Sequence, residues 1–282
     1  MTNPARPTVV IEADRGIIRI AGADRRSWLD GIVSCDLSAL DRGGVYGLFL
    51  NKQGKIQTDL DVVAGDDAVF VTLAPGQTEA TVAALDRMLI MEEAELTNES
   101  SELCVVRVHG ADADAWVREH LQTVAFGAVD WTGLGGVCAI VRRDALDALS
   151  THDDPDAWAM LRVARGFGVY GVDYDCKDNP REAALDRRAV SFSKGCYLGQ
   201  EVVCMQDMRG KLKRRLCILD VASQSVAFGA RVEHKGTDVG EVRSVAPRGG
   251  LCLARVAAPH FEIGSALGVA GAAAAVVGPQ GA

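Results

Sequence analysis

The cysteine of the segment KGCYLGQE has the surroundings best suited to chemistry in this sequence. Cys196 follows Lys194 and Gly195, and the run from Tyr197 to Met205 predicts a helix that begins directly after it. A lysine charge and a helix N-terminus both stabilise a thiolate and lower the pKa of a thiol. Such a thiolate can act as a nucleophile, a redox centre or a ligand for a soft metal. The alternative is burial as a small apolar side chain, which is common for free cysteines.

The remaining cysteines and histidines do not suggest a metal site. No cysteine pair has CxxC spacing, and the five histidines form no HExxH motif. If both lie on one helix, Cys204 is roughly 12 Å from Cys196, too far to share one metal ion. Most other cysteines lie in apolar runs such as LCVV and LCIL, which predicts that they are core residues. If a metal or cluster binds at Cys196, its other ligands must come from elsewhere.

A second candidate is a pair of carboxylates in the run IQTDLDVV, which follows the turn NKQGK. With the period of two of a strand, Asp59 and Asp61 share one face, while apolar residues occupy the other. A carboxylate on such a wall can accept paired hydrogen bonds from a flat heterocycle with an amidine-like edge. The alternative is that both side chains face solvent on a half-exposed sheet.

A basic run lies just beyond the cysteine segment. From Lys194 to Arg215 there are six basic and two acidic residues, in a chain whose net charge is −8. This local reversal of sign suits a phosphate backbone or the anionic tail of a ligand. A solvated loop between domains is the alternative.

Composition excludes several classes of protein. The 282 residues are 48% hydrophobic and 24% charged, which is typical of a globular protein with one or two domains. The negative net charge argues against binding to nucleic acid by overall electrostatic attraction. No apolar run approaches the roughly 20 residues of a membrane span, and the N-terminus has no apolar core of a secretory signal. We therefore expect a cytoplasmic protein without membrane contact, and reduced cysteines.

The elements that position these candidates alternate in a way that predicts α+β layers rather than a parallel doubly wound sheet. Expected strands are 9–12 and 17–20 joined as a hairpin, then 45–50, 56–63, 68–73, 103–108 and 137–141, with a short one at Val190 and Phe192. Expected helices begin after Asp24 and cover 78–91, 112–121 and 155–165. From Leu216 onward, short β runs separated by Gly and Pro turns predict a small antiparallel barrel or sandwich.

The segment KGCYLGQE resembles the signature of the YgfZ-type folate-binding proteins, a group that includes mitochondrial iron–sulfur assembly factors. These proteins are related to the aminomethyltransferase (T-protein) of the glycine cleavage system. The resemblance extends over nearly the whole chain, through GADRRSWLDGIVSCDL, LNKQGKIQTDLDV, LRVARGFGVYGVD, PREAALD and GTDVGEVRSV. The cysteine signature is specific, whereas the other motifs are shared with the transferase branch.

The resemblance implies an aminomethyltransferase-like fold, with antiparallel sheets and helices around a central folate cavity. It implies a folate-binding region over 1–210 made of two intertwined subdomains, with 46–145 as a ferredoxin-like part, and a β-barrel domain over 211–282. The implied function is support of iron–sulfur proteins, including enzymes that modify tRNA. Implied partners are assembly proteins or client enzymes, with a weak RNA contact as a further option.

The site residues that follow from this resemblance are Cys196 and Asp59 as the reacting groups. Tetrahydrofolate, or a derivative, would be held by Asp59, Lys194, Tyr197, Gln200, Glu201 and Arg214, and an iron–sulfur cluster would be bound only transiently. The runner-up function is a tetrahydrofolate-dependent aminomethyltransferase or demethylase with Asp59 as its acid–base residue. A third is a scaffold that binds RNA or protein through the basic run. The transferase branch typically carries a pterin-holding glutamate where this chain has Ala164, which weakens the runner-up.

Overall fold

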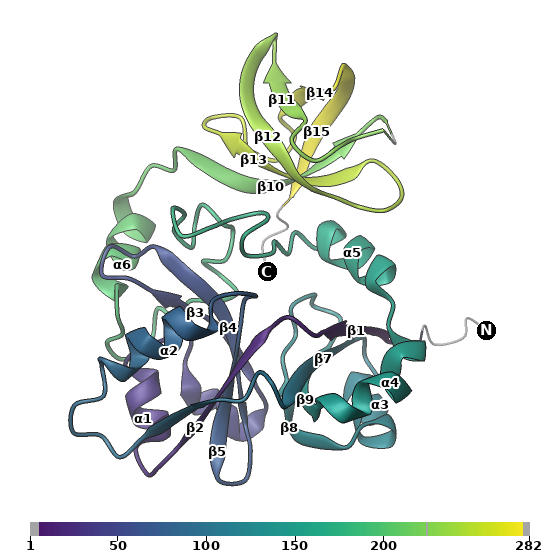
Figure 1. Cartoon of the computed structure of the whole chain (residues 1–282). Helices are drawn as coiled ribbons and strands as arrows, with labels where there is room; N and C mark the ends of the chain where they lie inside the picture. The colour runs from purple at the N-terminus through teal and green to yellow at the C-terminus, as the bar shows by residue number, and fades with distance from the viewer. Residues whose placement is uncertain (1–5, 224, 279–282) are drawn as a thin grey trace. The chain divides into compact units, whose positions relative to one another are not determined.

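The structure is a computed structural model that describes residues 6–223 and 225–278 of the chain (Figure 1). Its contacts divide the chain into two compact units, each assembled from segments far apart in sequence. The first unit consists of Met1–Leu50, Thr58–Pro155 and Ser191–Leu198, and the second of Asn51–Gln57, Asp156–Val190 and Gly199–Ala282.

The first unit contains a five-stranded sheet in the order β3-β4-β5-β2-β6. The strands are β2 (Gly16–Ala21), β3 (Val45–Leu50), β4 (Ile56–Ala64), β5 (Ala68–Leu73) and β6 (Glu95–Asn98). The short helices are α1 (Arg25–Asp30), the 3-10 turn η1 (Leu37–Arg42) and α2 (Thr78–Asp86). Trp28 and Leu29 of α1 and Leu85 of α2 join the apolar strand residues in one core, so burial of these helix faces fixes the helices on the sheet.

A second sheet of this unit has the order β1-β7-β9-β8. Its strands are β1 (Thr8–Glu12), β7 (Leu103–His109), β8 (Thr123–Ala128) and β9 (Gly136–Arg142). Helix α3 (Ala113–His120) packs on β7 and β9, and η2 (Arg143–Ala145), α4 (Leu146–Leu149) and η3 (Ser150–His152) follow β9. Every residue of β7 is buried, and one of them, Arg107, is charged.

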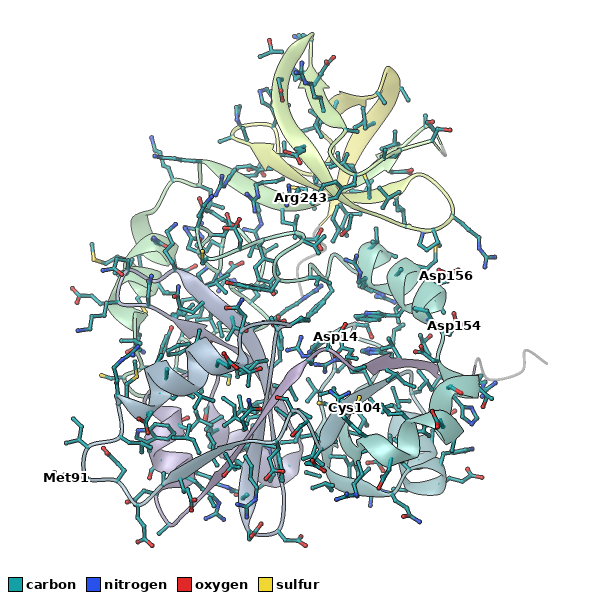
Figure 2. The ribbon with its side chains drawn as sticks, in the orientation of Figure 1. Asp14, Met91, Cys104, Asp154, Asp156 and Arg243 are labelled. Carbon is teal, nitrogen blue, oxygen red and sulfur yellow. The ribbon has the colours of Figure 1, made fainter. Side chains whose placement is uncertain are left out.

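The expected hairpin of the first two strands is wrong, although both strands exist. Val9 of β1 pairs with Val108 of β7, whereas Ile18 of β2 pairs with Val71 of β5. The two strands therefore belong to different sheets. The turn between them carries the labelled Asp14 (Figure 2) and then Arg15, whose side chain is buried. Strand length and turn residues do not reveal the partner of a strand when the partner is distant in sequence.

The second unit ends in a closed barrel with the strand order β10-β13-β12-β11-β14-β15. Its strands are β10 (Arg214–Val221), β11 (Arg231–His234), β12 (Thr237–Val245), β13 (Leu251–Ala257), β14 (Ala266–Val269) and β15 (Ala272–Gly278). Apolar residues such as Val232, Cys252 and Val256 fill its interior. Closure leaves no unpaired sheet edge, and the predicted barrel is confirmed.

The helices of the second unit are α5 (Pro155–Ala164), close to its expected limits, and α6 (Gln200–Arg209). The expected helix start at Tyr197 is wrong, because Gly199 has a left-handed backbone with a φ of 82° and the helix begins after it. The expected strand at Val190 and Phe192 is also absent, and that stretch is irregular. None of the described helices is long and apolar enough to cross a bilayer.

Candidate functional site

The signature cysteine lies on an exposed loop of the first unit. Cys196 is exposed, so the expectation of burial does not hold. By contrast, burial raises the pKa of the Cys104 thiol to about 11 and that of Cys35 and Cys138 to about 12. Cys217 and Cys252 in the barrel are likewise buried, with pKa values raised to about 12. Cys104 is labelled in Figure 2. The prediction that the cysteines in apolar runs are buried in the core is confirmed. Cys196, by contrast, is accessible to solvent.

Lys194 fixes this loop by a buried clamp. Its ammonium group donates to the Asp30 carboxylate at 2.8 Å and to the backbone oxygens of Asp30 at 2.6 Å, Val33 at 3.1 Å and Cys35 at 2.7 Å. Only 2% of the Lys194 side chain is exposed. Because an ammonium group has three N–H donors, these four acceptors occupy it fully.

The clamp changes the role expected of Lys194. Its donors are committed to Asp30 and the following turn, so it is not free to contact a folate, and its charge is matched by the Asp30 carboxylate. Tyr197 is buried, with its ring centroid 5.7 Å from Lys194 Nζ. The clamp therefore presents Cys196 from a rigid loop rather than surrounding it with free positive charge. Gln200 and Glu201 form the first turn of α6 in the second unit.

Asp59 and Asp61 share one face of β4, as the alternation predicts, but neither faces solvent. They are 2% and 0% exposed. Asp59 accepts hydrogen bonds from Arg15 Nη2 and from the Tyr46 hydroxyl, both at 3.3 Å. Arg15 Nη2 also lies 3.8 Å from Asp61. The two carboxylates thus line a buried polar site in the first unit.

Asp61 anchors this site. It accepts hydrogen bonds from Arg107 Nη2 at 2.5 Å, from Thr72 Oγ1 at 2.6 Å and from Trp131 Nε1 at 3.1 Å. Burial raises the pKa of Asp61, but the charges of Arg107 and Arg15 outweigh it and hold that pKa below its usual range. Asp61 is therefore a fixed anion.

Arg107 is the cation at the centre of the same network. It also donates from Nε to Glu12 at 2.5 Å, and its guanidinium lies 3.5 Å from the centroid of a Trp131 ring. Burial lowers the pKa of Arg107, but the charges of Asp61 and Glu12 outweigh this effect and raise it well above its usual value. Sequence reasoning missed Arg107 and Arg15. The signal was present in LCVVRVH, where the charge of Arg107 follows four apolar residues of a strand and, if buried, requires a buried partner.

His109, two residues further along β7, borders this network. Burial lowers its pKa to about 3, and the charge of Arg107 acts in the same direction. Its ring centroid lies 6.2 Å from that of Trp131. His109 is therefore neutral at physiological pH and adds no positive charge to the site.

One donor of the network makes no hydrogen bond. Arg15 Nε is buried and has no hydrogen-bond partner among residues 6–223 and 225–278, although it lies 3.7 Å from Glu12 Oε2. It adjoins Asp59, whose two contacts at 3.3 Å are longer than the roughly 2.7–2.9 Å of a tight charge-assisted bond. The Arg15–Asp59 pair is therefore less tightly held than the Arg107–Asp61 pair.

The basic run of the second unit is partly built into its core contacts. Arg214 donates to Asp178 at 2.8 Å and Arg215 to Asp186 at 3.3 Å, whereas Lys211 and Lys213 are exposed. The run is thus not simply a solvated loop. No group of three or more His, Cys, Asp or Glu side chains in the described part of the chain is arranged to hold a metal ion.

One stretch of the chain is similar to a known domain family. Residues 13–144 match the GCVT N-terminal domain. The matched residues run from β2 to β9, so they leave out β1, and they include Asp59, Asp61 and Arg107. The signature loop at Cys196 and the barrel lie outside the matched residues.

Three relatives that match most of this chain have different printed names. The iron-sulfur cluster assembly factor IBA57 homolog of Mycosarcoma maydis is 25% identical over 72% of this chain, and the match spans 54% of that protein. The tRNA-modifying protein YgfZ of Colwellia psychrerythraea is 22% identical over 76% of this chain and 72% of its own length. An aminomethyltransferase of Nostoc is 27% identical over 81% of this chain and 70% of its own length. The resemblance inferred from the motifs is confirmed.

A solved structure confirms the fold class. The glycine cleavage system aminomethyltransferase T from Bartonella henselae superposes with a TM-score of 0.80, covering 98% of this chain and 86% of its own. The sequences are 17% identical, so this likeness concerns the fold alone. The α+β, aminomethyltransferase-like prediction with a C-terminal barrel is correct.

Proposed function

We propose that this chain is a folate-binding accessory protein that supports the assembly or maintenance of iron–sulfur proteins, including tRNA-modifying enzymes, through Cys196. The observation that carries the proposal is the exposed thiol on a loop that Lys194 locks to Asp30. The names of the IBA57 and YgfZ relatives support the metabolic setting. One thiolate supplies one ligand, so a cluster in transit, as cargo, would draw its other ligands from an assembly protein or a client enzyme.

The test compares two exposed cysteines in cells that lack the native protein. Cys196→Ser is expected to lower the product of a cluster-dependent tRNA-modifying enzyme to the level of the deletion. Cys176→Ser is the matched control, because Cys176 is also exposed, and it is expected to leave the product unchanged. Full activity of Cys196→Ser at normal protein abundance would refute the assigned role.

Tetrahydrofolate is the proposed ligand of the first unit, at Asp59. The amide edge of a pterin offers N–H donors and a carbonyl acceptor. Asp59 supplies a loosely held carboxylate, and Arg15 Nε supplies a donor that makes no hydrogen bond within the described residues, so the chemical types match. Because these side chains are 2% and 7% exposed, the ring would have to separate Arg15 from Asp59. When bound, the folate would supply one-carbon chemistry.

Calorimetric titration of tetrahydrofolate into the full chain tests this assignment. Asp59→Asn is expected to weaken binding at least tenfold, since it removes a charge-assisted acceptor. Asp67→Asn is the control, because Asp67 is exposed and pairs with Arg19, and its binding is expected to equal that of the unchanged chain. No heat of binding to the unchanged chain would remove folate from the proposal while leaving the role of Cys196 open to its own test.

The alternative is an aminomethyltransferase with Asp59 as its acid–base residue, which the Nostoc relative favours. This activity would form methylenetetrahydrofolate from an amine donor and would be lost in Asp59→Asn. The accessory role is favoured because this chain has Ala164 at the position where the transferase branch typically carries a pterin-holding glutamate. Turnover with such an amine donor would favour the aminomethyltransferase over the accessory role.

Two further elements of the proposal concern setting and partners. We place the protein in the cytoplasm, where a reducing environment suits its eight cysteines, all of them free thiols. We propose that any weak contact with RNA involves Lys211 and Lys213, whose side chains are exposed, rather than Arg215, which is paired with Asp186. Such binding would fall steeply with salt.

A further inference from the structure

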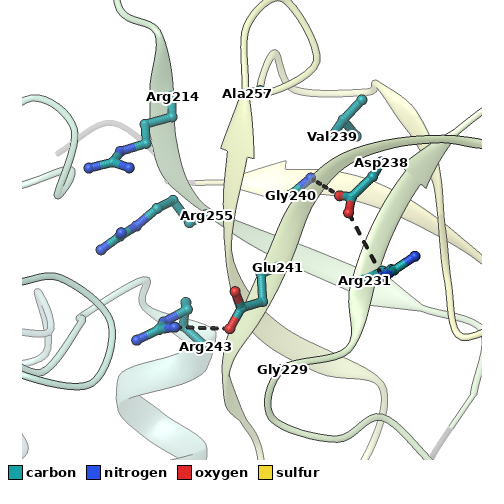
Figure 3. Close-up of a pocket in the computed structure, with 10 residues that line it drawn as sticks. All are labelled: Arg214, Gly229, Arg231, Asp238, Val239, Gly240, Glu241, Arg243, Arg255 and Ala257. Atoms are coloured by element: carbon teal, nitrogen blue, oxygen red, sulfur yellow. Dashed lines mark hydrogen bonds and ion pairs between the residues drawn. The ribbon is translucent and has the colours of Figure 1, made fainter.

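The outer surface of the barrel carries a pocket lined by four arginines. The pocket has a volume of about 510 Å³, within the range of roughly 300–1,000 Å³ of small-molecule sites. Figure 3 shows the side chains of Arg214, Arg255 and Arg243 extending to the same side from β10, β13 and β12. Arg231, Asp238 and Glu241 complete its charged lining, which therefore has a net charge of +2 in a chain of −8.

The order of the strands in the barrel brings Arg214, Arg255 and Arg243 close together. β13 lies between β10 and β12 in the barrel, and neighbouring strands are about 4.8 Å apart. Arg255 pairs in register with Glu241, and Arg243, two residues after Glu241 on the same face of β12, contacts Glu241 at 2.9 Å. Gly240 permits this close packing, since a Cβ there would lie 2.3 Å from the Arg255 carbonyl oxygen.

A buried carboxylate holds two of these arginines in place. Asp178, which is 1% exposed, accepts from Arg214 Nη2 through one oxygen at 2.8 Å and from Arg255 Nη2 through the other at 2.6 Å. One carboxylate thus orients two guanidinium groups and neutralises one charge of the two. The backbone oxygen of Val172 likewise holds Arg243 through Nε at 2.8 Å. Groups oriented in advance lose little side-chain entropy when a ligand binds.

Each of the three arginines keeps donors that are not used within the described residues. Arg214 and Arg255 donate only through Nη2, and Arg243 through Nε and Nη1. Arg214 Nε is a buried donor without a hydrogen-bond partner in the described part of the chain. Planar guanidinium groups with free N–H donors bind carboxylates and phosphates with good geometry.

We propose that this pocket is a binding site for a small molecule that carries at least two oxyanion groups, either carboxylates or phosphates. Asp178 holds the Arg214 and Arg255 guanidinium groups side by side through its two oxygens, which suits two adjacent anionic groups. Glu241 beside Arg243, and Asp238 beside Arg231, place negative charge within the lining, which disfavours a continuous phosphate backbone and favours a compact ligand over RNA. The pocket shares Arg214 with the residues that the family resemblance assigned to tetrahydrofolate, but it contains neither Asp59 nor Cys196, so its test does not depend on the proposed function.

Calorimetry on the full chain tests the proposal with citrate as the carboxylate probe and pyrophosphate as the phosphate probe. Acetate, with one charge, is the reference and is expected to bind at least tenfold more weakly than the better of the two probes. Arg243→Gln is expected to weaken that probe about tenfold, as the loss of a charge-assisted contact. Arg118→Gln, at an exposed pair with Asp114 on α3, is the matched control and is expected to bind normally.

Glu241→Gln guards against loss of binding through misfolding. It removes a negative charge from the lining, so it is expected to tighten binding about threefold. The proposal is overturned if neither probe binds better than acetate, if Arg243→Gln binds as well as the unchanged chain, or if Glu241→Gln has no effect. Tighter binding of a short RNA than of either probe, equally weakened by Arg243→Gln, would overturn the choice of a small ligand.

Discussion

Protonation of His109 should destabilise the first unit below neutral pH. The folded-state pKa of His109 is lowered to about 3 from an ordinary value of 6.5, first by burial and then by the charge of Arg107. Between these two values the unfolded chain binds a proton that the folded chain does not. The free energy of unfolding therefore rises with pH across this window. Above about pH 6.5 the protonation of His109 no longer reduces the free energy of unfolding.

The size of the effect follows from the same two values. One pKa unit corresponds to about 1.36 kcal/mol, so lowering the pH from 7 to 5 should cost about 2 kcal/mol of unfolding free energy through His109 alone. Urea unfolding at pH 5, 6 and 7 measures it. His109→Gln cannot titrate and should lose this dependence, whatever its stability at pH 7.

The control is His120→Gln, which changes an exposed histidine on α3 and should keep the full pH dependence. If the unchanged chain and His109→Gln lose the same free energy between pH 7 and 5, His109 is not held neutral by its surroundings. The reasoning about the buried network would then be refuted.

Three further predictions concern the same unit. Asp61→Asn should lower the unfolding free energy by about 3–5 kcal/mol, since it leaves the buried Arg107 charge with less compensation, and replacing both residues with apolar ones should recover part of the loss in urea unfolding. Lys194→Met should loosen the signature loop and speed its cleavage by proteases in limited digestion, whereas an unchanged rate would argue against the clamp. Gly47→Ala should destabilise the chain by more than about 1 kcal/mol, because its Cβ would lie 2.4 Å from a buried sulfur, whereas Gly195→Ala meets nothing within 4 Å and should be neutral in thermal unfolding.

Local sequence patterns predicted the helices and strands better than they predicted which strands pair and which side chains are in contact. The alternation of β4 correctly placed Asp59 and Asp61 on one face, because strand periodicity is a local property. It could not show that this face is buried, because burial depends on Arg107 and Trp131, which are 46 and 70 residues away from Asp61. The prediction that β1 pairs with β2 was wrong for the same reason, because their partners β7 and β5 are distant in sequence.

The environment of Cys196 shows the same limit. Its exposure agrees with a functional thiol, but the lysine two residues earlier reaches back to Asp30, 164 residues away. A helix was expected from Tyr197 because side-chain propensity allows it, whereas the clamp and the left-handed Gly199 delay it to Gln200. The role of Cys196 stays a prediction, whereas its position two residues after Lys194 in the sequence did not reveal that Lys194 contacts Asp30.

The return of Ser191–Leu198 to the first unit limits how this protein can be dissected. No single cut separates the chain into two self-sufficient fragments, since a piece ending before residue 191 lacks the lysine that anchors Asp30. During synthesis the N-terminal half must likewise wait for these residues to leave the ribosome before its last contacts form. The separate functions of the two units are therefore best studied by point substitutions rather than by truncation.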